Sequence, residues 1–298
     1  MDLTRTSFLG LIAGVTILIG LPVGRLRSPA PAMRALLNAS AVGVLLFLVW
    51  DVLSAAWEPI DVALAGLHDG SGGLGPAAGY GLLFAGGLAV GLLGLVGYEN
   101  WMGRQVVRAK TATTDPDGPR FGPGAMSATE ASARAGLAGW SAAERLALLI
   151  AVGIGLHNFA EGLAIGQSAA SGEIGLATLL VVGFALHNAT EGFGIVAPLA
   201  ARADATTAAH RPSWGFLLAL GAIGGGPTFI GTLVGHSVTS EPLAVLFLTL
   251  AAGSIVYVIT QLLYVAARSA RRDLVAYGLL IGLLAGFLTD AIVTAAGV

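Results

Sequence analysis

The sequence predicts an all-α integral membrane protein with eight transmembrane helices and both chain termini outside. Three observations predict this fold. Of the 298 residues, 55% are hydrophobic and only 11% are charged, and the mean hydropathy is +0.82, which is too apolar for a domain that folds in water. The apolar residues gather in eight long runs, and the positive residues gather in alternate loops between those runs.

Each apolar run is long enough to cross a hydrocarbon core, which needs about 20 helical residues. The first run could be taken for a signal peptide, because a positive residue, Arg5, precedes an apolar stretch. It ends in Leu-Pro-Val-Gly-Arg, however, and lacks a small-residue cleavage site, so we predict a retained helix. The eight predicted helices span residues 7–23, 33–57, 76–98, 143–170, 174–201, 213–236, 241–267 and 273–296.

The positive residues predict the orientation of the bundle. Apart from Arg5, all of the 15 Lys and Arg residues fall in loops on one side of the predicted helices. Short loops rich in Lys and Arg stay in the cytoplasm, so both termini are expected outside. This alternation supports the count of eight helices, because a missed or extra helix would move the later loops to the wrong side. We expect a multi-pass protein of the cell (inner) membrane.

The sequence predicts a single transmembrane domain over residues 1–298. Residues 103–141, the one sizeable stretch outside the apolar runs, are rich in Thr, Pro, Gly, Ala and Ser and are predicted to form a flexible cytoplasmic loop. Residues 58–69 are predicted to form an outer loop without positive charge. That loop either concentrates cations or is simply solvated, and its polar residues are Glu58, Asp61, His68 and Asp69.

Composition excludes several classes of protein. The chain has no Cys, which excludes disulfides, thiolate metal ligands and a cysteine nucleophile. It has no G-x-x-x-x-G-K-[ST] loop, so it carries no ATP-driven motor of its own. Its 44 glycines suit close contact between helices in lipid. We expect the lipid bilayer as a partner, no nucleic acid and no prosthetic group, and the sequence leaves a homodimer open.

Two polar motifs interrupt the fourth and fifth apolar runs. They read LHNFAEGLAIG and LHNATEGFGIV, and both contain His-Asn-x-x-Glu-Gly. At this spacing the three polar side chains share one face of a helix. Polar groups inside a membrane normally face a bundle interior, a cavity or one another. The six motif residues are His157, Asn158, Glu161, His187, Asn188 and Glu191.

The two motifs are expected at the same depth, near the midplane. His157 lies about 14 residues, or roughly 21 Å, into its helix, and His187 lies about 13 residues in from the other side. The helices are antiparallel, so the His of each should lie level with the Glu of the other, as in an inverted pair of transporter helices. Two imidazoles and two carboxylates suit a divalent transition ion such as Zn²⁺. Asn158 and Asn188 are then weaker oxygen ligands or supporting groups.

Two other interpretations start from the same residues. The polar groups could serve only to specify helix packing, but a doubled six-residue set at matched depth favours ligation. A membrane metalloenzyme would use similar ligands around an activated water. The metalloprotease motif is His-Glu-x-x-His, however, with two ligands on one helix. Here each helix carries one His and a Glu four residues later, a spacing that favours ligation over water activation.

The chain resembles the ZIP (Zrt/Irt-like) family of divalent metal transporters. The specific part of the resemblance is HNFAEGLAIG at 157–166 and HNATEG at 187–192. It implies that these two helices carry the transport site and that metal moves from outside into the cytoplasm. We therefore expect a transporter and not an enzyme, with Zn²⁺ as the first choice of metal and Fe²⁺, Mn²⁺ or Cd²⁺ as alternatives. A membrane metalloenzyme and a metal-binding homologue that does not transport remain the rival hypotheses.

The motifs depart from the family pattern at three places. Ala160 and Thr190 precede the glutamates, where the family often has Pro. Gly226 stands before Pro227, where relatives with a two-metal site often have a carboxylate. The seventh run has Thr260 and Gln261 where acidic residues are common. The resemblance thus implies a reduced site at Gly226, with one ion or two left open, and leaves the acidic positions of the seventh run unfilled.

Two more carboxylates fall inside the apolar runs. Asp51 and Asp290 each lie about 17 residues into a helix that starts in the cytoplasm, which places both in the outer half of the membrane. We include Asp51 among the candidate metal ligands. Either carboxylate could instead line an entrance or make a hydrogen bond between helices. Gln167 is a weaker entrance candidate, and the run Gly224–Pro227 is predicted to break its helix in mid-membrane as a hinge or a crossing point.

Overall fold

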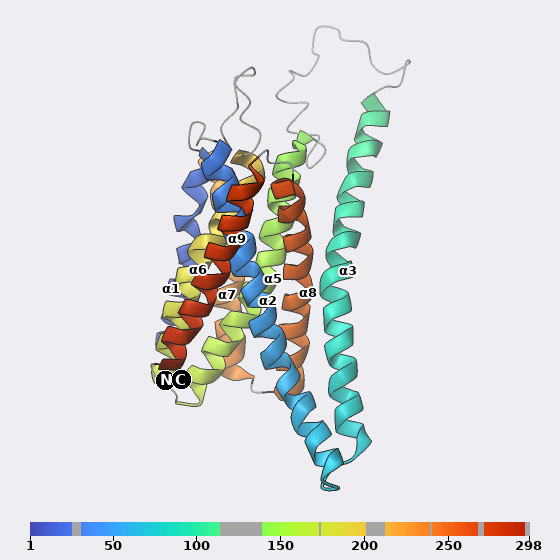
Figure 1. The fold of residues 1–298 in the computed structure, drawn as a ribbon, viewed down its shortest axis with the longest axis vertical. Coiled ribbons are helices and arrows are strands. Elements are labelled where there is room, and N and C mark those ends of the chain that lie inside the picture. The colour runs from blue at the N-terminus through green and yellow to red at the C-terminus, as the bar shows by residue number, and fades with distance from the viewer. Residues whose placement is uncertain are drawn as a thin grey trace.

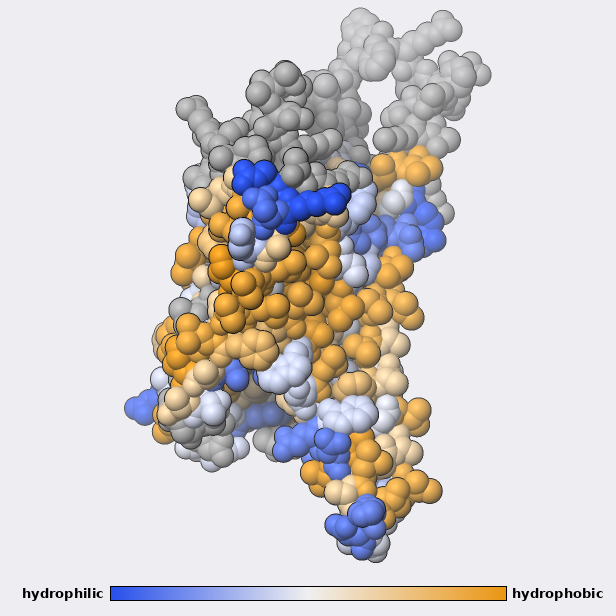
Figure 2. All heavy atoms as spheres, viewed as in Figure 1, coloured by the Kyte–Doolittle hydropathy of each residue, from blue (hydrophilic) through white to orange (hydrophobic). Residues whose placement is uncertain are grey.

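The protein is described here by a computed structural model that covers residues 1–25, 31–113, 139–172, 174–200, 212–238, 240–267 and 271–295. Within these residues all regular secondary structure is helical, and eight helices are long and apolar enough to cross a membrane. The predicted all-helical class and the eight helices long enough to cross a membrane are therefore confirmed for the described part of the chain. A broad apolar band crosses the face of the bundle shown in Figure 2, and hydrophilic side chains gather toward its two ends.

Most helices follow the predicted runs closely. The first begins as α1 (Leu3–Val15) and tightens into two 3₁₀ turns, η1 (Thr16–Ile19) and η2 (Leu21–Arg25). The first residue of α1 and the last turn of α9 lie at the same end of the bundle (Figure 1). The five later helices are α5 (Ala142–Ala170), α6 (Ile174–Ala200), α7 (Trp214–Ser237), α8 (Glu241–Ala267) and α9 (Arg272–Ala295).

Two helices are much longer than predicted. Helix α2 (Pro31–His68) has 38 residues and α3 (Leu74–Thr113) has 40, which correspond to about 57 and 60 Å at the α-helical rise. Their hairpin projects past the end of the other helices (Figure 1). The predicted outer loop at 58–69 is therefore wrong for most of its length, because the stretch that follows Pro59 is rich in Ala, Leu and Val and continues the helix to His68.

The predicted cytoplasmic loop at 103–141 also starts later than expected. Helix α3 continues to Thr113, so the first part of that stretch is helical. Ser141, at its other end, caps α5. Residues 114–138, which make up the rest of the predicted loop, lie outside the described residues.

Most of the close helix packing falls within two groups of helices. In the first group, α5 packs closely on α7, α7 packs on α1, and α6 packs on α5 and η1. In the second, α2 packs on α9 and α8, and α3 packs on α8. Helix α5 also meets α8 across the boundary between the groups, where the Ser254 hydroxyl donates a hydrogen bond of 2.9 Å to the carbonyl of Gly153. Small residues let these backbones approach one another closely.

The predicted break in α7 is wrong, because α7 runs without interruption through Pro227. Its glycines serve close packing instead. A Cβ added at Gly225 would collide with the carbonyl of Gly14 on α1, and one at Gly224 would crowd Ile17 and Ile195. The run is therefore a crossing point, where two neighbouring helices come close to α7.

The glycine packing predicts unequal effects of two matched substitutions. In Gly235→Ala the new methyl group would overlap the backbone carbonyl of Leu163, whereas Gly79 on α3 has nothing within 4 Å of an added Cβ. We expect Gly235→Ala to cost about 1–3 kcal/mol by overpacking, and Gly79→Ala to be neutral or to gain up to about 1 kcal/mol in helix propensity. Size-exclusion profiles after heating would measure both apparent melting temperatures. Equal melting temperatures would contradict this account of the packing.

Candidate metal centre

Helices α5 and α6 form an antiparallel pair that carries both polar motifs. A capping box fixes the start of α5, because the Ser141 hydroxyl accepts a hydrogen bond from the Glu144 amide and the Glu144 carboxylate accepts one from the Ser141 amide. The turn after α5 contains Gly172 at φ +83°, a left-handed conformation that favours glycine. Each motif keeps its His and Glu one helical turn apart.

The side chains of the two motifs converge. Oε1 of Glu161 lies 2.8 Å from Nε2 of His157 on its own helix and 2.5 Å from Nε2 of His187 on the other. Nε2 of His157 is also 3.8 Å from Oε1 of Glu191. The two imidazole rings are 6.3 Å apart between centroids. Each His thus lies beside the Glu of the opposite helix, and one carboxylate oxygen lies between the two imidazoles.

This cluster is almost completely buried. The side chains of His157 and Glu191 are 1% exposed, that of Glu161 is 5% exposed and that of His187 is 12% exposed. Several buried polar atoms lack a hydrogen-bond partner among the described residues, namely both ring nitrogens of His157, Oε2 of Glu161 and both carboxylate oxygens of Glu191. The contact between His157 and Glu161 has the distance of an ion pair but not the geometry of a hydrogen bond. Unpartnered buried groups of this kind are costly unless something coordinates them.

The two asparagines hold neighbouring helices. The side-chain amide of Asn158 donates to the carbonyl of Gly224 on α7 at 3.0 Å, one residue after Ile223, whose carbonyl Pro227 leaves without its helical donor. The amide of Asn188 donates to the carbonyl of Ala13 at 3.0 Å, where α1 tightens into η1. Each asparagine therefore binds a backbone carbonyl of another helix. Their side-chain oxygens are buried and have no hydrogen-bond partner among the described residues.

The cluster has the composition and nearly the size of a metal site. One ligand atom each from His157, Glu161 and His187 lies within 4.8 Å of the other two. Zn²⁺ binds nitrogen and oxygen at about 2.0–2.2 Å, so tetrahedral ligand atoms are about 3.3 Å apart. The observed contacts of 2.5 and 2.8 Å are shorter. The side chains would have to separate by roughly half an ångström to admit an ion at these distances.

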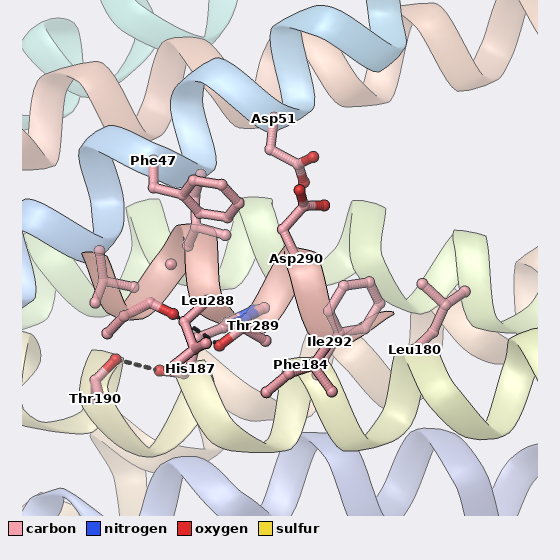
Figure 3. A pocket seen from close by; sticks show the side chains of 15 residues that line it. Phe47, Asp51, Leu180, Phe184, His187, Thr190, Leu288, Thr289, Asp290 and Ile292 are labelled. Carbon is pink, nitrogen blue, oxygen red and sulfur yellow. Dashed lines mark hydrogen bonds between the residues drawn. The ribbon is translucent and has the colours of Figure 1, made fainter. Parts of the chain in front are cut away.

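Asp51 lies beside this cluster and not within it. It lines a cavity between α2, α6 and α9 with a volume of about 420 Å³, and His187 and Thr190 line the same cavity. Figure 3 shows Asp51 on α2 and Asp290 on α9 pointing toward each other. His187 thus belongs to both the cluster and the cavity wall. The cavity leads from the two carboxylates to one imidazole of the candidate metal centre.

The other polar candidates from the sequence have structural partners. The amide of Gln167 donates to the carbonyl of Val238 at 3.2 Å, which ties the end of α5 to the end of α7. The hydroxyl of Thr260 donates to the carbonyl of Tyr257 within α8. On the same turn, the hydroxyl of Tyr257 donates to the carboxylate of Glu99 on α3. These side chains are bonded outside the cluster of α5 and α6.

Two features of the site were missed in the sequence. We considered Asp51 and Asp290 separately, although their equal distance from the cytoplasmic ends of two helices was a signal that they could meet. We also assigned no role to α1 and α7 at the site. Pro227 frees the carbonyl of Ile223 and was therefore no signal for the bond that Asn158 makes to Gly224 on α7. No signal in the sequence marks the 3₁₀ turn that ends α1.

Eight apolar helices around a buried His and Glu cluster define a multi-pass membrane protein with a candidate metal centre in its interior. Comparison with known families agrees with this class. The sequence model of the family described as ZIP zinc transporter matches residues 114–294. The chain belongs to the ZIP family and is a metal transporter. Because members of this family are not enzymes, the metalloenzyme alternative is set aside. No curated protein matches the sequence.

The geometry of the cluster predicts that metal binding stabilises the fold and needs Glu161. Wild-type protein in detergent should gain about 2.7 kcal/mol at a Zn²⁺ concentration one hundred times the dissociation constant. Glu161→Gln keeps the size of the side chain and removes its charge, so most of this gain should be lost. The matched control is Glu241→Gln at the start of α8, where the carboxylate accepts a hydrogen bond from Tyr80. Melting curves with and without Zn²⁺ measure the gain, and equal shifts in all three proteins would exclude the cluster as the binding site.

Proposed function

We propose that this ZIP-family protein takes up a divalent transition metal, Zn²⁺ above all, into the cytoplasm through the cluster of α5 and α6. One observation supports this proposal most directly. Oε1 of Glu161 lies 2.8 and 2.5 Å from the imidazole nitrogens of two different helices, at a place buried from solvent. Ionisable side chains are rare inside a membrane and mark functional sites, and a carboxylate between two imidazoles is the kind of ligand set that binds a cation.

The donor set supports a borderline transition ion over a hard one. Imidazole suits Zn²⁺, Cu²⁺, Fe²⁺ and Ni²⁺, whereas Mg²⁺ and Ca²⁺ prefer sites made of oxygen alone. Two imidazoles and one carboxylate leave the fourth position of a tetrahedral ion open. We assign that position to Glu191, 3.8 Å from the nearest imidazole nitrogen. Asn158 and Asn188 then support the site through α7 and α1.

We assign the approach of the ion to the cavity between α2, α6 and α9. Asp51 and Asp290 line this cavity, and His187 forms part of its wall. An ion held by the two carboxylates would meet the imidazole of His187 next. In this proposal Asp51 is a ligand on the approach, and the cluster beyond His187 is the transport site.

We infer the direction from the distribution of charge. The positive residues other than Arg5 belong to loops or helix ends away from the termini, and such segments remain in the cytoplasm. This orientation puts the termini and the α2–α3 hairpin outside the cell (inner) membrane. Uptake then carries the ion from the hairpin side to the side of Arg25 and Arg145.

The mechanism we propose is ligand exchange at the midplane together with movement of the helix group that holds the site. The close glycine contacts join α1, α5, α6 and α7 into one unit, and that unit meets the other four helices across the boundary at α5 and α8. Binding also displaces protons from His and Glu side chains, so uptake should depend on pH.

Uptake of metal into vesicles tests this function. His157→Ala and Glu191→Ala should each lower the initial rate of Zn²⁺ uptake by about tenfold or more, because each removes a ligand whose loss costs at least about 1.4 kcal/mol. Fe²⁺, Mn²⁺ and Cd²⁺ are measured in parallel to rank the metals. Glu241→Gln serves as the control and should retain the wild-type rate. Unchanged flux in the two site variants would exclude the cluster as the transport site.

A further inference from the structure

The cavity beside the metal centre has a chemical character that metal transport does not explain. Its volume of about 420 Å³ lies in the range of pockets that hold small organic molecules. Most of its wall comes from apolar side chains of α2, α6 and α9, and Phe47, Phe184 and Leu288 are among them (Figure 3). A bare or hydrated metal ion would make no favourable contact with these apolar walls.

The cavity reaches the outer surface of the helix bundle. Leu288 and Ile292 line it and are nevertheless 62% and 55% exposed, so they form its rim. Both lie on α9, whose exposed residues from Leu280 to Ile292 are all apolar and include Leu284 and Phe287. A surface of this kind faces lipid in a membrane-spanning helix. A molecule dissolved in the bilayer can therefore reach the cavity from the side.

Two acidic side chains line the cavity beside its apolar wall. Asp51 and Asp290 point toward each other from α2 and α9 (Figure 3). Neither carboxylate takes part in any ion pair formed by the described residues. Two carboxylates next to an apolar wall repel one another and are costly to bury without a cation. A neutral acyl chain would fill the apolar part and leave this charge unpaired, and an anionic lipid would be repelled.

We propose that this cavity binds an amphipathic ammonium from the bilayer. Its cationic nitrogen lies between the carboxylates of Asp51 and Asp290, and its apolar body packs against Phe47, Phe184 and Leu288. The two aromatic rings add the attraction that cations have for the face of a ring. Because His187 is part of the same wall, this occupant closes the approach to the metal centre, which makes the cavity an inhibitory site.

Photolabelling of the full chain in lipid nanodiscs tests the proposal. The probe is dodecylammonium with a diazirine in its chain, and the matched neutral probe is the corresponding dodecanol. Mass spectrometry locates the labels. We expect the ammonium to label residues 180–190 and 285–292 about tenfold more than the alcohol does, because a desolvated hydrogen bond to a charged group contributes about that factor. Both probes should label the lipid-facing side of α3 near Leu82 and Val90 equally.

Two variants separate the charge of the cavity from its shape. Asp290→Asn should reduce ammonium labelling of α6 and α9 to the level of the alcohol. Thr289→Phe keeps both carboxylates but fills the space that Thr289 lines, and it should abolish labelling there by both probes. Elution profiles confirm that each variant is folded, and Asp51→Asn replaces Asp290→Asn if the latter does not elute as the wild type does.

Three results would overturn the proposal. Equal labelling of the cavity by the ammonium and the alcohol would mean that a neutral chain fills it. Labelling spread evenly over α3, α6 and α9 would mean that no site exists. Unchanged labelling in the Asn variant would mean that the carboxylates do not hold the ammonium. Labelling does not depend on metal flux, so these outcomes are independent of the uptake experiment.

Discussion

The carboxylate of Glu161 lies between two imidazoles in the interior of the bundle. The packing of α5 against α6 depends on this contact, because it offsets the cost of burying the carboxylate. Charge is costly to bury in a membrane, where water cannot solvate it. Here the cost is met by bringing His157 from the same helix and His187 from its antiparallel neighbour within 2.8 and 2.5 Å of one oxygen. The arrangement joins α5 to α6, and among the described residues the second oxygen of Glu161 and both oxygens of Glu191 have no hydrogen-bond partner. The same contact therefore holds two helices together and keeps free ligand atoms beside them.

The asparagines extend this organisation to the next layer of helices. Asn158 binds α7 beside a proline, and Asn188 binds α1 where the α-helix changes to a 3₁₀ turn. On α1 this is the point where the helix tightens into a 3₁₀ turn, and on α7 it is the residue after Ile223, whose carbonyl Pro227 leaves without a helical donor. The two halves of the doubled motif thus make equivalent bonds to different neighbours. Any displacement of α5 and α6 would have to carry α7 and α1 with it or break these bonds.

The sequence predicted the fold class, the eight spans and the pairing of the motifs, because long apolar runs and the helical period are local properties of the chain. It did not predict the length of α2 and α3, since Glu58 and Asp61 suggested a loop in a stretch whose Ala and Leu residues continue the helix. It also predicted a break at Pro227, because local propensity does not include the close packing of α1, η1 and α6 on that glycine run. The meeting of Asp51 with Asp290 depends on how α2 and α9 pack, which no short segment of the sequence records.

The long hairpin of α2 and α3 provides a convenient reporter of sidedness. Its tip is a short turn around Gly70, at φ +74°, and Gly73, where an added Cβ would meet nothing. All residues from Asp69 to Gly73 are exposed, and the tip stands clear of the helices that hold the cluster. A short epitope inserted there would be recognised by an antibody only from the compartment that the hairpin enters. Whole cells and inverted vesicles would then give opposite signals, with the ligands of the ion left unaltered.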